Sequence, residues 1–417
     1  MRRAAGIVLF WLLLLPGAAS ASAPNDPGWS QQWNLSTIRA DRAWARSKGL
    51  GVVVAIVDTG VDLNHPDLAG RLVSGYDFVD GGTPMDANGH GTFMAGIVAA
   101  ATGNGEGVAS IAPSAKVMPV RVLNDKGVGD ASVVADGIRW AVQQGADVIN
   151  LSLAETSGGG FTPGDFFSSS DIDSAIRYAA NAGRFVSVAA GNHFDTGGTP
   201  YTAYDSRVAQ ALVVGASTST DKRAAYSNYG AGLDVLAPGG GSSSSSDACQ
   251  TNAPVISTWW NAGTSQYGKG CGTSMSTAHV SGIAALLMAR GYSAAGAANQ
   301  IVATAKSISG GYKRVDAYAA VGAVSSPPPA QTQSPHARPS PRRTVTAAAS
   351  PAAAPSVKDT KIVAPTPSPS PSATLLGLAG TGEGPLEARR GLIVIATALS
   401  FMVGLAHPLS RFWLRTR

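Results

Sequence analysis

Apolar runs and amphipathic stretches alternate along the middle of the chain. Residues 52–57 are all apolar, which is typical of a strand buried on both faces of a parallel sheet. Similar runs predict further strands at residues 116–123, 147–153, 186–190 and 211–216. Amphipathic stretches predict helices at residues 131–144, 171–182, 293–305 and 315–324. This alternation predicts an α/β fold, in which a parallel sheet is covered by helices on both faces.

The two ends of the chain carry apolar segments of another kind. Residues 1–23 combine a short cationic start, an apolar stretch and small residues in A-x-A patterns, which predicts a secretory signal peptide. An uncleaved amino-terminal anchor is the alternative. Residues 391–409 contain no Asp, Glu, Lys or Arg and are long enough for one transmembrane helix. Arginines lie on both flanks of this helix, and those in residues 410–417 favour a cytoplasmic tail.

Composition divides the remainder into two parts. Residues 24–324 are predicted to form one folded domain, whereas residues 325–390 are rich in Pro, Ser and Ala and are predicted to be a disordered linker. Residues 24–325 contain 19 Lys and Arg against 23 Asp and Glu, so the net charge of +5 comes from the termini, with 12 against 3. Because the folded part is mildly acidic, no nucleic-acid partner is expected. The prediction is a single-pass protein of the cell membrane, with its folded domain outside the cytoplasm.

Three short stretches hold the residue types of nucleophilic catalysis. Asp58 follows the strand at residues 52–57, and His90 lies between glycines at the start of an apolar stretch. Ser274 follows a glycine-rich turn and precedes another apolar stretch. A serine hydroxyl becomes a good nucleophile when an imidazole takes its proton and a buried carboxylate orients that imidazole. A serine in such a turn is by itself usually a helix cap, so the prediction depends on all three stretches together.

The motifs D-T-G at Asp58, H-G-T at His90 and G-T-S-M at Ser274 resemble, in this order, those of the subtilisin-like serine proteases, or subtilases. The resemblance extends over residues 29–324 and is greatest to thermitase-like subtilases. It implies a serine endopeptidase that cleaves proteins or peptides through an acyl-enzyme, with His90 as the base and no cofactor required for catalysis. His65, in a turn, is the alternative base.

The resemblance also implies roles around this triad. Asn192 ends an A-A-G-N stretch and is expected in the oxyanion hole beside the backbone N–H of Ser274. Ser152 and Leu153 match the segment on which a substrate lies as an added strand. Further substrate-binding candidates are Ala189, Ala190 and Gly191.

The chain departs from the subtilase pattern at two places. Ala154 and Glu155 replace a usual pair of glycines, which could narrow the cleft or add a negative charge at its rim. Ala278 stands where proline is usual, and this change is expected to have little chemical effect because alanine also suits a helix.

Two features are expected to stabilise the fold. Cys249 and Cys271 are the only cysteines and are predicted to form a disulfide in an extracytoplasmic protein. The resemblance implies a structural calcium ion at Asp67 and residues 102–108. That loop has few oxygen-bearing side chains, however, and a solvated glycine-rich turn is the alternative that the residues favour.

Two alternative functions remain open, and no inhibitory pro-domain is expected. A signal peptide, protease domain, linker and single span also resemble the mycosins, whose partners are components of type VII secretion systems; the T-S-M motif here differs from the T-S-F or T-S-Y expected for them. The other alternative is a catalytically silent surface protein, against which the complete set of site residues argues. The stretch between residues 23 and 51 is no longer than the usual opening segment of a subtilase, so an inhibitory pro-domain is not expected.

Overall fold

A sheet of nine strands forms the centre of the protein. The computed structural model describes residues 23–155, 170–192, 211–230, 232–244 and 253–322, and the backbone of residues 375–378 and 380–383. The strands of the sheet are, in spatial order, β12 (Lys306–Ser307), β13 (Lys313–Arg314), β9 (Val235–Pro238), β8 (Leu212–Ser217), β7 (Phe185–Ala189), β5 (Val148–Leu151), β1 (Val53–Asp58), β3 (Lys116–Arg121) and β2 (Tyr76–Asp77). Neighbouring strands are parallel except in the β12–β13 pair at one edge. The predicted α/β architecture is therefore confirmed.

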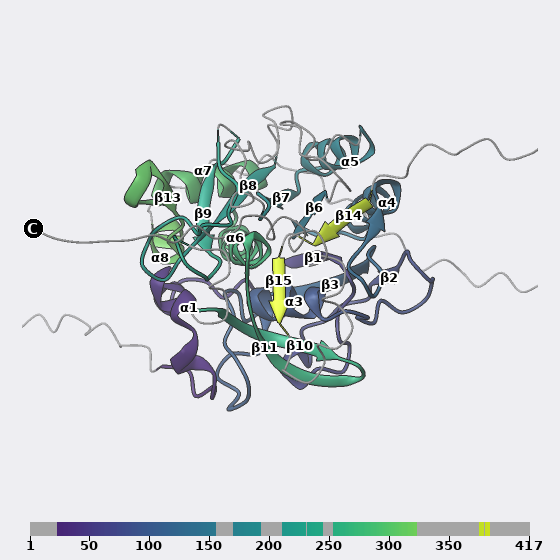
Figure 1. Cartoon of the computed structure of the whole chain (residues 1–417), viewed down its shortest axis with the longest axis horizontal. Helices are drawn as coiled ribbons and strands as arrows, with labels where there is room; N and C mark the ends of the chain where they lie inside the picture. Colours follow the sequence, from purple (N-terminus) through teal and green to yellow (C-terminus); the bar gives the residue numbers. More distant parts are fainter. Residues whose placement is uncertain are drawn as a thin grey trace, which may run out of the picture.

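Helices cover both faces of this sheet (Figure 1). Helices α3 (His90–Ala99) and α6 (Thr273–Met288) pack on one face, and α4 (Ala131–Gln143) and α5 (Ser170–Asn181) pack on the other. Four further helices contribute to the core on the α3–α6 face: α1 (Trp33–Thr37), α2 (Ala40–Ala43), α7 (Ala294–Thr304) and α8 (Ala317–Gly322). Single 3-10 turns lie at Trp29–Gln31, Pro66–Leu68 and Ser309–Gly311.

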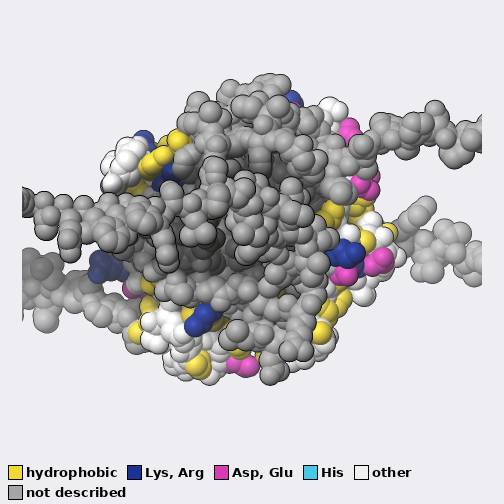
Figure 2. All heavy atoms as spheres, viewed as in Figure 1, with side chains coloured by type: hydrophobic (Ala, Val, Ile, Leu, Met, Phe, Trp, Pro, Cys, Tyr) yellow, Lys and Arg dark blue, Asp and Glu magenta, His cyan; other side chains and the backbone are white. Residues whose placement is uncertain are grey.

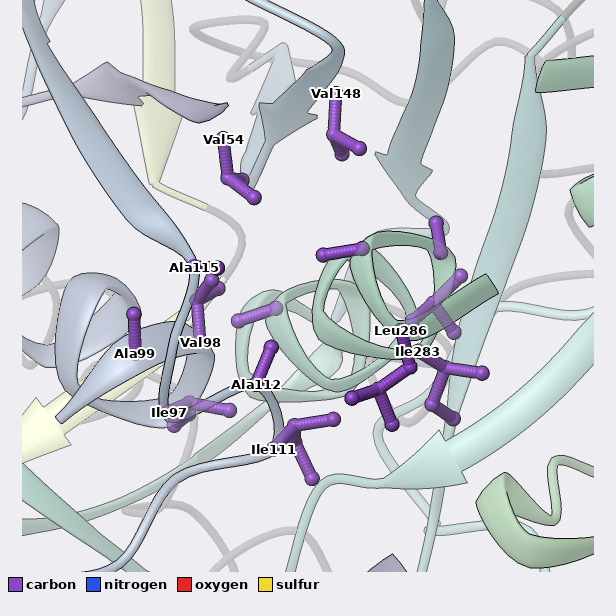
Figure 3. Packing of buried hydrophobic residues seen from close by; sticks show 14 of the residues in the cluster. Val54, Ile97, Val98, Ala99, Ile111, Ala112, Ala115, Val148, Ile283 and Leu286 are labelled. Carbon is purple, nitrogen blue, oxygen red and sulfur yellow. The ribbon is translucent and has the colours of Figure 1, made fainter. Parts of the chain in front are cut away.

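Strand β1 shows why a run without polar positions forms the centre of this sheet. Side chains alternate between the two faces along a strand. Val54 and Ile56 therefore belong to the core beneath α3 and α6, while Ala55 and Val57 belong to the core beneath α4 and α5. Figure 3 shows the first of these cores, where residues of α3 and α6 meet Val54 of β1.

A long antiparallel hairpin, β10 (Val255–Asn261) and β11 (Thr264–Gly272), encloses α3 from the side away from the sheet. The hydroxyl of Ser257 donates to the carbonyl of Phe93 at 2.7 Å, and that of Thr258 donates to the carbonyl of Thr92 at 2.7 Å. Strand β11 continues into α6 without an intervening loop, because it ends at Gly272 and the helix begins at Thr273.

Within residues 325–390, where the composition predicts a linker, the structure has two short strands, β14 (Leu375–Leu378) and β15 (Gly380–Glu383). They join two small three-stranded sheets, β4-β14-β6 and β10-β11-β15, where β4 is Gly129–Asp130 and β6 is Leu153–Glu155. The predicted signal peptide up to residue 22 and the predicted span at residues 391–409 lie outside the described residues. Among the described residues, no helix is both long and apolar enough to cross a membrane.

Figure 2 shows one face of the molecule, and the described side chains lie around its rim. Acidic and basic groups are interspersed along this rim. This agrees with the small net charge of the folded part and gives no patch of a single sign for a polyanionic partner on this rim.

Candidate active site

The predicted site residues meet at one edge of the sheet. Strands β7, β5 and β1 are neighbours and parallel, so their carboxyl ends lie side by side. Asp58 is the last residue of β1, Ser152 follows β5, and Asn192 lies three residues beyond β7. The amino terminus of α6, with Ser274, lies against the same edge, since Ser152 bonds to Ser274. In α/β sheets this is the edge at which ligands and catalytic groups collect.

Asp58 and His90 form a buried hydrogen-bonded pair. Nδ1 of His90 lies 2.9 Å from Oδ1 and 2.9 Å from Oδ2 of Asp58. The exposed fractions of the two residues are 0% and 1%. A carboxylate only accepts, so Nδ1 carries the proton, and Nε2 is the nitrogen that can take another one. Among the described residues Nε2 has no hydrogen-bond partner although it is buried. This orientation leaves Nε2 as the ring nitrogen that can accept a proton.

Glycines on both sides of His90 are required by close backbone contacts. Gly89 has φ +107°, and a Cβ there would lie 2.5 Å from the carbonyl oxygen of Trp260. A Cβ on Gly91 would lie 2.0 Å from the carbonyl oxygen of Gly60. A side chain at Gly91 would push the start of α3 away from the end of β1, and one at Gly89 would push it away from β10, so either would displace His90.

Asp86, which the sequence interpretation did not single out, fixes the start of α3. Its Oδ1 accepts from the N–H of Gly89 at 2.8 Å, and its Oδ2 accepts from the N–H of Thr92 at 2.9 Å. Burial raises the pKa of Asp86, and these hydrogen bonds oppose that rise. Oδ1 also accepts from Thr59 Oγ1 at 2.8 Å, which connects the first turn of α3 to the end of β1. The sequence signal was an acidic residue just before a helix, where a carboxylate can satisfy free N–H groups.

Ser274 is the second residue of α6 and is buried. Its hydroxyl donates to the carbonyl of Ser152 at 3.2 Å, and the hydroxyl of Ser152 donates to the carbonyl of Ser274 at 3.0 Å. Deeper in the same helix, Ser281 donates to Oδ1 of Asn150 at 2.8 Å. These bonds hold the first turn of α6 against the carboxyl end of β5.

Asn192 is oriented by the residue before Ser274. Its Oδ1 accepts from both the backbone N–H and the hydroxyl of Thr273, each at 2.9 Å. With its oxygen used in this way, the amide has only N–H donors to offer a further partner. Gly191 has φ +97° and donates its N–H to Thr273 at 3.1 Å, which brings the end of β7 to α6. The preceding Ala189 and Ala190 are buried.

The substrate-binding candidates Ser152 and Leu153 lie just beyond the carboxyl end of β5, where β6 begins. The side chain of Leu153 is fully buried in the core beneath α4 and α5, so only its backbone can pair with a ligand. The departure at Ala154 and Glu155 continues this segment as strand β6.

Two other histidines are structural. His65 caps a 3-10 turn through Nδ1, which accepts from Asp67 N at 3.2 Å, while its Nε2 lies 2.8 Å from the carbonyl of Gln266. It is not part of the pair with Asp58. His279 donates from Nδ1 to the carbonyl of Met275 at 2.7 Å and accepts at Nε2 from Asn34, also at 2.7 Å. Burial lowers the pKa of His279 to about 4, so it stays neutral at physiological pH.

Both carboxylate oxygens of Asp67 accept hydrogen bonds from within the fold. Its carboxylate accepts from Nδ2 of Asn104 at 3.0 Å and from the N–H of Val108 at 2.9 Å. Burial raises the pKa of Asp67 to about 6. The described residues contain no group of three or more His, Cys, Asp or Glu that could hold a metal ion. Structural calcium is typical of related enzymes, and a calcium ion at Asp67 stays a prediction.

Cys271 is buried three residues before Ser274, at the end of β11. Cys249 lies outside the described residues, and the pairing of the two cysteines stays a prediction.

Comparison with known proteins agrees with this geometry. The family model described as "Subtilase family" matches residues 49–323. Thermitase of Thermoactinomyces vulgaris is 43% identical over 305 residues, which cover 72% of this chain and 99% of thermitase. A thermophilic serine proteinase of Bacillus sp. (strain AK1) is 38% identical, with 72% of this chain and 70% of the relative covered.

Solved structures give the same result. A protease from Pseudoalteromonas arctica PAMC 21717 has a TM-score of 0.62 and 35% identity, covering 73% of this chain and 100% of that one. A cold-adapted subtilisin-like serine proteinase has a TM-score of 0.52 and 32% identity, covering 64% of this chain and 89% of that one. From the strand that ends at Asp58 to the helix that carries Ser274, the chain belongs to the subtilase family of serine proteases.

Proposed function

We propose that Asp58, His90 and Ser274 form the catalytic triad of this serine protease and that Asn192 stabilises the oxyanion. The observation that carries the proposal is the buried His90–Asp58 pair, with both oxygens 2.9 Å from Nδ1 and with Nε2 left without a partner among the described residues. A buried imidazole nitrogen without a hydrogen-bond partner costs free energy, and a catalytic role is one reason why a fold keeps such a group.

The arrangement supports acyl transfer in two steps. His90 Nε2 takes the proton of the Ser274 hydroxyl as its oxygen attacks a peptide carbonyl carbon. Asp58 stabilises the positive imidazolium that forms. The negative oxygen lies between the amide of Asn192 and the N–H of Ser274, at the positive end of α6. The proton then passes to the leaving nitrogen, and water hydrolyses the ester.

A fluorophosphonate probe tests this proposal directly. We expect the wild type to be labelled on one serine, and Ser274→Ala to be neither labelled nor able to hydrolyse casein. Ser276→Ala is the matched control, since Ser276 lies in the same helix, is equally buried and bonds only to carbonyls within the fold. Labelling that persists in Ser274→Ala would contradict the assignment of the nucleophile.

His90→Ala gives a second test, because the probe needs an activated serine. We expect a loss of about 10⁶-fold in turnover, similar to that from removal of the serine, on the scale measured for the histidine of subtilisin. A variant that retains more than about 1% of turnover would show that His90 is not the base.

The proposal extends to location. Residues 1–23 direct export, and residues 391–409 anchor the protein with its protease domain outside the cytoplasm. The Ser274→Ala chain is the proper material, because it cannot cut itself. We expect it to stay in the membrane fraction after alkaline carbonate extraction and to become soluble when residues 391–417 are deleted. An intact chain that carbonate releases would contradict the anchor.

A further inference from the structure

Strand β14 occupies the place of a substrate beside β6. It lies between β4 and β6 and is antiparallel to both, as the middle strand of a small sheet. Leu378 pairs with Leu153, and Gly377 pairs with Ala154. An added antiparallel strand of this kind is how extended peptides bind to a free strand edge. The strand comes from residues 375–378, far from the protease domain in the sequence.

Strand β15 continues the same chain past the nucleophile. Gly380 pairs with Gly272, two residues before Ser274, and Thr381 pairs with Cys271. Figure 1 shows the two yellow strands, β14 beside β6 and β15 beside β11. Leu378 therefore pairs with the residue after Ser152, Gly380 pairs with the residue two before Ser274, and in the sequence one residue, Ala379, separates Leu378 from Gly380.

The pairings on both sides of Ser274 involve the same segment, residues 375–383. Ser152, whose carbonyl accepts from the Ser274 hydroxyl at 3.2 Å, immediately precedes the residue that pairs with Leu378. On the other side, Gly380 and Gly272 form a pair in which neither residue has a Cβ, and Gly382 pairs with Gly270 in the same way. Such glycine pairs let two backbones approach closely.

A bound segment also accounts for the enclosed nucleophile. Ser274 has an exposed fraction of 0%, and His90 has 1%. A protease nucleophile has to contact its substrate, so complete burial fits a cleft that is already filled by an extended chain.

The segment can reach the cleft within one molecule. Residues 323–374 connect α8 to β14, and an extended chain spans roughly 3.3 Å per residue, so this length is ample for a domain of this size. A covalent connection makes the pairing intramolecular, so its effective concentration is set by the length of the linker and not by the concentration of the protein. Weak pairing is therefore enough to fill the cleft.

We propose, on the basis of the proposed triad, that residues 375–383 are a built-in substrate that Ser274 cleaves between Ala379 and Gly380. Ser274 Oγ attacks the carbonyl carbon of Ala379, its proton passes to His90, and the bond to the Gly380 nitrogen breaks as that nitrogen takes the proton. Water then hydrolyses the ester and leaves a carboxylate on Ala379. The cut separates residues 380–417, which include β15 and the proposed anchor, so the protease is released and the part of the cleft beside β11 is emptied.

The test uses the full chain expressed in membranes, with termini identified by mass spectrometry. We expect the wild type to yield a released domain that ends at Ala379 and a fragment that begins at Gly380, and we expect neither product from Ser274→Ala. Gly380→Pro should slow the cut by about 100-fold or more, because proline removes the N–H and displaces the scissile bond. Ser372→Pro is the matched control, since it adds a proline to the same tail outside β14, and it should be cut at the wild-type rate.

Fluorophosphonate labelling and casein hydrolysis by the same samples separate this inference from the function on which it depends. An active wild type that stays intact between Ala379 and Gly380 would overturn the self-cleavage alone. A cut at another bond would overturn the register, and a cut that persists in Ser274→Ala would assign it to another enzyme. A wild type that neither labels nor hydrolyses casein would overturn the triad itself.

Discussion

Helices α3 and α6 differ from α4 and α5 in how much of their surface is buried. Every residue of α3 is buried, and α6 is buried from Thr273 to Leu287. In α4 and α5 the buried residues form one stripe each at helical spacing: Val134, Ala135, Gly137, Ile138, Ala141 and Val142, and Ile172, Ala175, Ile176 and Ala179. The proposed base, His90, and the proposed nucleophile, Ser274, both belong to the two enclosed helices, α3 and α6.

This difference shows where the fold provides rigidity. Helix α3 lies between the sheet and the β10–β11 hairpin, and α6 lies among the sheet, α3 and α7. A helix enclosed on all sides cannot shift without moving two layers, so residues in its first turn keep their positions. Helices α4 and α5 stabilise the other face of the sheet and expose the remainder of their surface to water.

The largest expected effect in this comparison concerns the first turn of α6, where Thr273 donates two hydrogen bonds to Asn192. Asn192→Ala should lower kcat by about 100- to 1000-fold with little change in KM, because the amide stabilises charge that exists only in the transition state. Steady-state kinetics on a peptide substrate measure both constants. Asn299→Ala, on the exposed side of α7, is the control and should match the wild type. A rise in KM alone would place Asn192 in substrate binding instead.

The next effect concerns the strand that leads into α6. If Cys249 and Cys271 are bridged, Cys271→Ser should lower the free energy of unfolding by about 3 kcal/mol. Cys249→Ser should cost a similar amount, and the double variant should cost no more than either single one. Urea unfolding of the Ser274→Ala chain measures this without self-digestion. Two free thiols in a non-reduced digest would refute the bridge.

A smaller effect compares the two pairs of helices directly. A Cβ at Gly96 in α3 would lie 2.2 Å from Thr258 Oγ1 and 2.4 Å from Ser257 Oγ, so Gly96→Val should destabilise the fold by about 2 kcal/mol. Arg139→Ala, on the solvent side of α4, should change stability by less than about 0.5 kcal/mol. Equal costs in urea unfolding would show that the hairpin yields and that α3 is not enclosed as tightly as its contacts indicate.

The smallest effect is the pH dependence at Asp67. Because burial raises its pKa to about 6, its protonated form favours the folded state. That contribution is fully present below the unfolded pKa near 4 and is lost as the pH rises through 6, so the wild type should lose about 1 kcal/mol relative to Asp67→Asn between pH 4 and 7. Thermal unfolding with a chelator measures the difference. A calcium-dependent rise in Tm of the wild type alone would instead support a calcium site.

Local patterns predicted much of this fold from the sequence. The helix expected at residues 131–144 is α4 (Ala131–Gln143), because its apolar stripe repeats within the segment itself. The strand expected at residues 52–57 is β1 (Val53–Asp58), because a run without polar positions has to be buried on both faces. Asp58, His90 and Ser274 were found through the glycines and apolar runs beside them, which are equally local.

Features that depend on distant partners were not found from the sequence. The β10–β11 hairpin was not predicted, because its position depends on contacts with α3, whose carbonyls accept hydrogen bonds from Ser257 and Thr258. Asp86 differs, since its partners Gly89 and Thr92 lie within six positions along the chain, and an acidic residue before a glycine-flanked helix start was a usable signal. Strands β14 and β15 come from a composition typical of disorder and take their conformation from the cleft that they pair with.

The hydrogen bond between Asn34 and His279 has a consequence for the order in which the chain is assembled. The two residues are separated by 245 positions, so a ribosome completes the first long before it makes the second. Until α6 has formed, the amino-terminal segment has no imidazole to receive the Asn34 amide, and a contact of such long range is entropically costly to close early. This contact can therefore form only after nearly the whole domain has been synthesised.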